Sequence, residues 1–284
     1  MQPSIIDAII NLVKNPVTQL VREYHSRNRA NNAGDALEEY VKDLFAGTFD
    51  MDESARLERL ESVFSYLGNN SNPPDAMLRG GDAIEVKKIE TLDASLALNS
   101  SYPKHTIRAD SPMISEACRN AENWNEKDML YVVGSVHKNI LRHLIMVYGL
   151  DYCASESCYQ RLKSRIANGV NAIEGVEFSE TKELGRVNRV DPLGITYLRV
   201  RGMWGIENPW TVFRYVYQRN MCMKLNFMAL INARKWQTLP GTDRVLELAE
   251  RNSSLKVSDV KIKDPDNPAH LNEAKLIQFT VPKV

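Results

Sequence analysis

One short segment constrains the fold of this chain more than any other: residues 72–88, with the sequence NPPDAMLRGGDAIEVKK. Residues 83–89 (AIEVKKI) favour a β-strand, because apolar and β-branched side chains dominate them. The preceding run RGGD, residues 79–82, predicts a tight turn. We therefore expect a hairpin that brings Asp75, at the start of its first strand, beside Glu85 on the second strand.

The charged side chains of this hairpin have the chemistry of a metal-dependent nuclease. Side chains two positions apart on a strand share a face, so Glu85 and Lys87 point the same way, with backbones roughly 6–7 Å apart. Val86 points to the other face, where a core is expected. Two carboxylates and a lysine suit Mg²⁺ binding and the activation of water against a phosphodiester. The alternative is a solvated hairpin, because loose matches to such a pattern arise by chance.

A helix is predicted just upstream, over residues 34–45 (GDALEEYVKDLF). Its apolar side chains recur at helical spacing and form one stripe: Leu37, Val41, Leu44 and Phe45. Glu38 borders this stripe, and an acid beside a buried face needs a partner, so Glu38 is a candidate acid for the metal site. An ordinary surface glutamate is the alternative for Glu38. Glu39 lies with Lys42 and Asp43 on the face expected to be wet, and we predict a surface role for it.

Composition is that of an ordinary globular protein: 284 residues, 43% apolar and 25% charged. No apolar run approaches the length of a membrane span, so we expect no contact with a membrane. The segment from Ser4 to Val13 carries Asp7 and lacks a basic start, so it predicts a first helix rather than a signal peptide. The four cysteines show no metal-ligand spacing with the histidines, which favours free thiols in a reducing cytoplasm.

The net charge is zero, with 36 basic and 36 acidic residues, which argues against a nonspecific nucleic-acid coat. A specific DNA enzyme is still compatible with this balance, because the distribution of charge decides it. Residues 186–219 contain six arginines and no lysine, against only Asp191 and Glu207. A smaller basic patch spans residues 22–29 (REYHSRNR). Basic contact surfaces are therefore predicted at these two places.

The order of predicted elements indicates an α+β fold, with a mixed central β-sheet flanked by helices. Helices are predicted over 4–24 (interrupted near 15–16), 34–45, 51–67, 113–123 and 155–173. Strands are predicted over 83–89, 95–98, 129–136, 141–148, 195–203, 227–231 and 276–281, with loops over 27–33 and 69–74. No repeat or low-complexity linker divides the chain, so we expect one endonuclease domain over 1–284. Its catalytic core would span about 30–150 and its DNA-reading region about 180–220.

Two segments carry side chains suited to DNA contacts. The first, residues 98–105 (LNSSYPKH), offers an amide, two hydroxyls and an amine to phosphate oxygens, from Asn99, Ser100, Ser101 and Lys104. A polar turn before a proline is the alternative. The second comprises residues 186–189 (RVNR), with Asn188 and Arg189, and residues 197–209.

In the second segment, Arg199 and Arg201 share a strand face, which suits bidentate contacts to guanine in a groove. Structural ion pairs with Asp191 and Glu207 are the alternative. Trp204, between two glycines, is expected to be a core aromatic rather than a wedge.

The helix over 34–45, the PPDAMLRGGDAIEVKK hairpin, the LNSSYPK loop and the run LRVRGMWGIENP, taken together and in this order, resemble the NgoPII family of type II restriction endonucleases. The resemblance runs from the N-terminus to about Phe227. It implies the PD-(D/E)xK restriction-endonuclease-like core, a homodimer, dependence on Mg²⁺ with Mn²⁺ as a substitute, and cleavage of double-stranded DNA at the palindrome GGCC. It also implies a cognate DNA methyltransferase as the partner in the cell. The family's catalytic pattern falls on Asp75, Glu85 and Lys87, without departure.

The sequence therefore predicts a Mg²⁺-dependent, site-specific DNA endonuclease. Asp75 and Glu85 would hold the metal, and Lys87 would orient or deprotonate the attacking water and neutralise charge in the transition state. One alternative is a PD-(D/E)xK nuclease of DNA repair or of DNA junctions. The other is a sequence-specific DNA-binding protein whose acids are structural and which does not cut.

Overall fold

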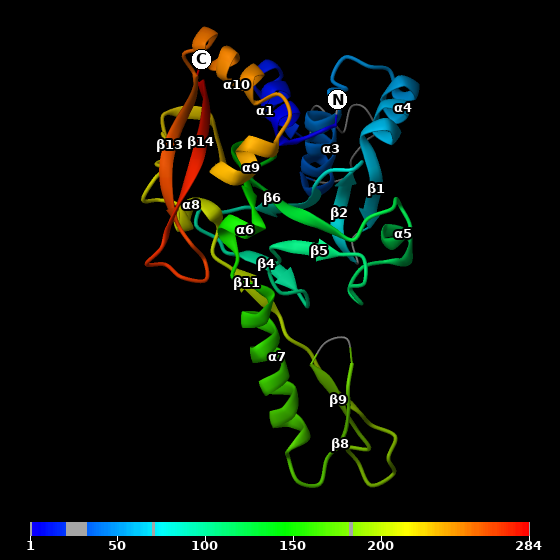
Figure 1. Cartoon of the computed structure of the whole chain (residues 1–284). Helices are drawn as coiled ribbons and strands as arrows, with labels where there is room; N and C mark the ends of the chain where they lie inside the picture. Colours follow the sequence, from blue (N-terminus) through cyan, green and yellow to red (C-terminus); the bar gives the residue numbers. More distant parts are fainter. Residues whose placement is uncertain (1, 21–32, 70–71, 182–183, 284) are drawn as a thin grey trace.

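The computed structural model describes residues 2–20, 33–69, 72–181 and 184–283. Most strands belong to one central sheet: β1 (Phe64–Asn69), β2 (Asn72–Leu78), β3 (Ala83–Ile89), β5 (Thr106–Arg108), β6 (Glu126–His137), β7 (Ile140–Tyr148), β12 (Met223–Asn232), β13 (Leu255–Lys263) and β14 (Leu271–Pro282). Their order is β1-β2-β3-β6-β7-β12-β14-β13, with β5 paired to β6 (Figure 1). β3 runs parallel to β6 and β7 parallel to β12, while the other neighbours are antiparallel. The predicted α+β class with a mixed central sheet is confirmed.

Apart from α7, which projects away from the body, the helices lie around this sheet (Figure 1): α1 (Ile5–Lys14), α3 (Ala33–Ala46), α4 (Glu53–Val63), α5 (Glu116–Arg119), α6 (Gly149–Tyr152), α7 (Glu156–Asn171), α8 (Pro209–Val212), α9 (Ala233–Thr238) and α10 (Thr242–Arg251). The helix α1 begins with the predicted capping motif, in which the Ser4 side chain accepts from a backbone amide and the Asp7 carboxylate accepts from the Ser4 amide. No helix of the described chain is both long and apolar enough to cross a bilayer.

The sheet carries an apolar layer on each face. One layer joins α1 and α3 to alternate residues of the strands, among them Ile84 and Val86 of β3. The other layer joins the neighbouring strand positions, such as Ala83 and Ile89, to α6 and α8. A strand whose two faces are both covered reads as a nearly continuous apolar run. This explains why the segments over 129–136 and 141–148 predicted a buried antiparallel pair, which β6 and β7 confirm.

The hairpin expected within residues 72–88 forms. β2 and β3 are antiparallel, with Ala76 opposite Ile84 and Met77 opposite Ala83. The turn between them uses Gly80 at a φ of +65°, a backbone conformation that favours glycine. The amide of Gly81 donates to the carbonyl of Leu78 and closes the turn. The sequence therefore places both halves of the motif on neighbouring strands.

An arm extends from this body (Figure 1). It consists of α7 and a three-stranded sheet of β8 (Glu177–Ser179), β9 (Gly185–Asn188) and β10 (Leu198–Val200). The chain returns to the body through β11 (Trp204–Ile206), which pairs with β4 (Leu96–Asn99). No residue of α7 is buried, and its apolar positions Leu162 and Ile166 are 49% and 40% exposed. The arm therefore presents apolar side chains to the outside.

Several predicted boundaries are wrong. The helix expected over 51–67 ends at Val63, because Phe64 to Leu67 pair with β2 instead. The loop expected over 69–74 contains the start of β2, and only 116–119 are helical within 113–123. Within the helix expected over 4–24, α1 ends at Lys14, in agreement with the interruption predicted near 15–16, and residues 21–24 lie outside the described residues. The strand expected over 195–203 contains only β10. Most of the predicted loop over 27–33 and the basic patch over 22–29 lie outside the described residues.

Candidate active site

The predicted catalytic residues meet where β2 and β3 separate. Asp75 lies one position beyond the last paired residues of the hairpin, Ala76 and Ile84. Its carboxylate Oδ2 accepts a hydrogen bond from the backbone amide of Val86, at 2.6 Å. A side chain thus replaces the backbone pairing that the hairpin loses here. This contact fixes the Asp75 carboxylate against the strand that carries Glu85 and Lys87.

Glu85 and Lys87 share one face of β3, as the strand period predicts. The Lys87 amine lies 2.6 Å from Glu85 Oε1, and the side chains of Lys87 and Glu85 are 24% and 14% exposed. Val86 points to the opposite face and is buried in the core, as predicted. The second oxygen of Glu85, Oε2, is buried and has no hydrogen-bond partner among the described residues. An orphaned carboxylate oxygen of this kind is a free ligand position for a cation.

The charges of the site also favour binding of a cation. Burial, and then the neighbouring Glu85 carboxylate, raise the pKa of Asp75 to about 7, against the opposing effects of Lys87 and the Val86 amide. Burial alone would lower the pKa of Lys87, but Glu85 and Asp75 outweigh burial and raise it. The two carboxylates therefore carry more negative charge than one lysine balances, which favours binding of a metal ion.

The donor set fits Mg²⁺ better than a metal that needs a full protein cage. The described residues contain no group of three or more histidine, cysteine or acidic side chains arranged to hold a metal. Mg²⁺ is usually held by one or two carboxylates together with waters and substrate phosphates, so two acids suffice. Asp75 and the free oxygen of Glu85 are the residues that could hold it. The described side chains do not offer the ligand set of a zinc site.

Glu38 reaches the same region from α3. It lines a small cavity together with Asp75, Phe64 and Val86. Burial raises the pKa of Glu38, with smaller effects from Lys42, which lowers it, and Asp35, which raises it. Glu38 also contributes to the raised pKa of Asp75. The structure thus brings the predicted supporting acid next to the hairpin that carries Asp75.

The predicted surface role of Glu39 and Asp43 is wrong. Asp43 is fully buried and lies 2.7 Å from Arg56 Nε of α4, while Glu39 Oε2 lies 2.6 Å from Arg56 Nη2. Lys42 also pairs with Glu39, at 2.6 Å. The periodicity of one helix does not reveal an arginine that a second helix supplies. This ion-pair network joins α4 to α3, the helix that carries Glu38.

The polar loop after β4 lies beside the active site, but its lysine is less exposed than a phosphate contact suggests. Lys104 is only 9% exposed, and its amine donates to Ser101 Oγ at 2.6 Å and to the Tyr102 carbonyl at 3.2 Å. Burial lowers the pKa of Lys104 to about 8, partly offset by the Glu85 carboxylate. Asn99 is exposed and Ser100 is partly exposed, so both can contact a ligand from solvent.

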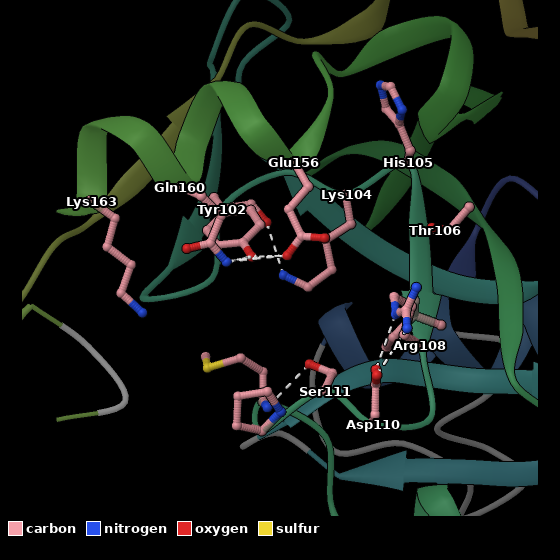
Figure 2. A pocket seen from close by; sticks show the side chains of 13 residues that line it. Tyr102, Lys104, His105, Thr106, Arg108, Asp110, Ser111, Glu156, Gln160 and Lys163 are labelled. Carbon is pink, nitrogen blue, oxygen red and sulfur yellow. Dashed lines mark hydrogen bonds and ion pairs between the residues drawn. The ribbon is translucent and has the colours of Figure 1, made fainter.

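A cleft of about 390 Å³ adjoins this loop, between β5 and the first turns of α7 (Figure 2). Within it, the Tyr102 hydroxyl donates to Glu156 at 2.6 Å and accepts from Gln160 at 2.8 Å. Lys104 and Lys163 also line the cleft. Tyr102, Glu156 and Gln160 have no predicted role in the sequence, because the cleft forms only when α7 packs beside the loop. Because α7 closes this cleft, its lining comes from segments far apart in the sequence.

The other predicted contact residues lie on the arm. Arg199 of β10 is opposite Arg186 of β9, and both Arg199 and Arg201 are exposed. Arg201 Nη2 lies 3.4 Å from Ser100 Oγ, so the two predicted contact segments meet. Asn188 donates to Ser179, at 3.1 Å. Arg189 lies 3.5 Å from Glu177. The structure thus brings the arm arginine next to the β4 loop.

Two other residues of the arginine segment, Asp191 and Trp204, have alternative roles predicted from the sequence, as an ion-pair partner and as a core aromatic. The Asp191 carboxylate accepts from the amides of Leu193 and Thr196, at 3.0 and 2.6 Å, so it organises its own loop. Trp204 is only partly buried rather than a full core residue. It packs against Tyr102 and Tyr159, with ring centroids 6.0 and 5.6 Å away. This aromatic cluster attaches the base of the arm to the body.

Comparisons with known proteins agree with this geometry. A model of the NgoPII restriction endonuclease family matches residues 3–263. The chain is 61% identical over 277 residues to the type II restriction enzyme NgoPII of Neisseria gonorrhoeae, and the aligned region covers 97% of this chain and 99% of that protein. No solved structure matches the chain significantly. The match continues well beyond Phe227, where the resemblance noted from the sequence motifs ends.

Proposed function

Because the chain belongs to the NgoPII restriction endonuclease family, we propose that Asp75, Glu85 and Lys87 form its active site and that Mg²⁺ is its metal. The chain is a type II restriction enzyme, a site-specific deoxyribonuclease of a restriction-modification system. This family assignment argues against both alternatives. One is a nuclease of DNA repair or of DNA junctions, and the other is a DNA-binding protein without catalytic activity.

One observation carries the assignment of the site. Asp75 is fixed by the Val86 amide at 2.6 Å, while Glu85 on the same strand as Val86 keeps one buried oxygen without a partner among the described residues. Two acids are thereby held next to each other with a ligand position to spare. An ordinary solvated hairpin has no reason to bury a carboxylate oxygen without a partner, because such burial costs stability.

The roles of the three residues follow from their charges. When bound, Mg²⁺ supplies positive charge at the scissile phosphate and makes a bound water more acidic. Asp75 and Glu85 hold and orient this ion through carboxylate oxygens. Lys87 keeps its proton, because the neighbouring carboxylates raise its pKa. A charged lysine cannot accept a proton, so we assign it to orienting the attacking water and neutralising the phosphate rather than to deprotonation.

Glu38 is assigned a supporting role, at the edge of the same site. Its contribution to the pKa of Asp75 and its place in the cavity with Asp75 support this role. Glu38 would act in one of two ways: it would hold a water molecule bound to the metal ion, or it would hold the Asp75 side chain in place. A charge-conserving substitution to aspartate tests the requirement for its reach without removing the carboxylate.

For the target, we propose GGCC, cut by a homodimer, with Mn²⁺ as a metal substitute. A palindrome presents the same edge twice, and a two-fold dimer places one active site on each strand. Arg199, Arg201, Asn188 and Arg189 are proposed as reading or backbone contacts from the arm, with Asn99, Ser100, Ser101 and Lys104 from the β4 loop. A cognate methyltransferase would protect the host's own sites. Free thiols at Cys118, Cys153, Cys158 and Cys222 support a cytoplasmic location.

Digestion of a sequenced plasmid tests this proposal. With Mg²⁺ present, the purified protein should give discrete fragments, and sequencing of their ends should place every cut within GGCC. Branched or damaged duplexes that lack this sequence should stay intact. Fragments with ends at another sequence would refute the target, and cleavage in EDTA would refute the metal mechanism.

A further inference from the structure

A row of side chains crosses the sheet just beyond the catalytic residues. Ile89 of β3 is opposite Ser135 of β6, Ser135 is opposite His143 of β7, and His143 is opposite Asn226 of β12. Ile89 lies two positions after Lys87, so this row is about 7 Å further along the strand on the same face. The row therefore lies on the side of the sheet that carries the active site.

Two members of this row are buried without hydrogen-bond partners among the described residues, although the His143 ring lies 5.5 Å from the ring of Trp210. Ser135 is 1% exposed and His143 is 5% exposed. Neither the Ser135 hydroxyl nor either ring nitrogen of His143 has a hydrogen-bond partner in the described parts of the chain. Asn226 differs, because its side chain accepts from the amide of Asn220 and donates to its carbonyl. Buried polar groups are nearly always hydrogen-bonded, so two orphans side by side indicate an absent partner.

Ser135 and His143 are among the residues that line a pocket of about 410 Å³. Leu92, Met221 and Met223 supply apolar wall, and Arg142 and Lys283 supply positive charge. Glu90, the acid in the lining, pairs with Lys88 at 3.1 Å. The pocket thus combines an apolar wall, a polar part formed by a hydroxyl and an imidazole, and cationic side chains. Thioether side chains suit the faces of flat, polarisable rings.

The imidazole of His143 is available for hydrogen bonding in its neutral state. Burial, and then the nearby Arg219 and Arg142, lower the pKa of His143 to about 4. The ring is therefore neutral near pH 7 and offers one donor and one acceptor. A phosphate would leave the acceptor nitrogen unpaired and would have to enter an apolar wall. An aromatic heterocycle with both donors and acceptors on its edge satisfies the whole set.

We propose that this pocket receives one base of the DNA substrate, rotated out of the duplex next to the cleaved bond. The base edge would meet Ser135 and His143, its faces would contact the methionine and leucine side chains, and the phosphates that flank it would face Arg142 and Lys283. Enzymes that extrude a base read it in this way, by hydrogen bonds at its edge and apolar contact at its faces. The inference rests on the proposed position of the active site, because that position brings DNA to this end of the sheet.

Fluorescence of 2-aminopurine tests the proposal. Duplexes carry this base at each position of the cleaved sequence and its flanks, and Ca²⁺ replaces Mg²⁺ so that DNA binds uncut. We expect a several-fold rise in fluorescence on binding at one position. Ser135→Ala and His143→Phe, which keep the shape of the pocket but remove its polar atoms, should reduce this rise. His270→Phe, at an exposed histidine elsewhere, is the matched control and should leave the rise unchanged.

Each failure has a separate meaning. Thermal melting of the variants shows that they fold, and cleavage by the wild-type protein with Mg²⁺ is measured in parallel. If the wild type cleaves yet no position brightens, no base is extruded and the inference is wrong. If a position brightens equally in folded Ser135→Ala and His143→Phe, the base lies elsewhere and the pocket assignment is wrong. A wild type that does not cleave would instead contradict the proposed function.

Discussion

The carboxylate of Asp75 accepts a hydrogen bond from the backbone amide of Val86, at 2.6 Å, across the point where β2 and β3 separate. This single contact couples the two halves of the motif. It spans a place where backbone pairing has ended, and it ties the first acid to the strand that carries Glu85 and Lys87. Changes to Asp75 therefore affect both local structure and chemistry, and experiments must separate the two.

Removing the charges of the proposed active site should abolish cleavage without unfolding the protein. Asp75→Asn keeps an acceptor for the Val86 amide, so it is a better test than alanine, which also loses that hydrogen bond. Asp75→Asn and Glu85→Gln should lose cleavage because both acids serve the metal, while Lys87→Ala should lose cleavage but keep metal binding. Plasmid digestion and circular dichroism measure the two effects. Glu247→Gln, at an exposed acid of α10, is the control, and turnover at the wild-type rate by Asp75→Asn would contradict the site assignment.

Metal replacement should separate binding from cutting. Mg²⁺ and Mn²⁺ should support cleavage, since both accept oxygen ligands in octahedral geometry. Ca²⁺ should support specific binding but not cleavage, because its larger and looser shell misplaces the attacking water. Gel shifts and digestion with each metal measure this. Vigorous digestion in Ca²⁺ alone would show that the geometry of the metal shell does not limit the reaction.

The raised pKa of Asp75 predicts how the stability of the metal-free protein depends on pH. Its pKa in the folded protein is about 7, while a carboxyl in the unfolded chain has a pKa of about 3.9. The folded state then binds the proton more tightly, so this contribution to stability is complete below the unfolded value and is lost as pH rises through about 7. In EDTA, the free energy of unfolding should therefore fall as pH rises from about 4 to about 7, and it should fall less in Asp75→Asn. Urea titrations at several pH values measure this free energy for both proteins. The same dependence on pH in both proteins would contradict the raised pKa.

The sequence predicts this hairpin and the β6–β7 pair because both depend on contacts between neighbours in the chain. Partners that come from distant segments are not predictable in this way. Arg56 of α4 turns Glu39 and Asp43 into a buried network, and Arg201 meets Ser100 only where the arm returns to the body. β13 is not among the predicted strands, although its sequence LKVSDVKIK contains three β-branched residues, and its pairing with β14 defines it.

The arm arginines should affect the choice of DNA sequence. If Arg199 and Arg201 read guanines, alanine at either position should weaken binding to the specific site by about 1–3 kcal/mol and leave random DNA nearly unaffected. If Lys104 contacts phosphate, Lys104→Ala should weaken both kinds of binding and reduce the salt slope by about one. Fluorescence anisotropy at several salt concentrations measures both. Equal losses on all sequences in the arginine variants would reassign these side chains to the phosphate backbone.

The Arg56 network should stabilise the helix that positions Glu38. Arg56 is 3% exposed and Asp43 is fully buried, so Arg56→Ala leaves a buried carboxylate without its cation. We expect a loss of about 3–5 kcal/mol in the free energy of unfolding. Arg251→Ala, at an exposed arginine in the last turn of α10, is the control and should change little. Adding Asp43→Asn to Arg56→Ala removes the stranded charge and should restore part of the loss. A double variant as unstable as the sum of its single variants would show that the two residues do not interact, because coupled neighbours are non-additive.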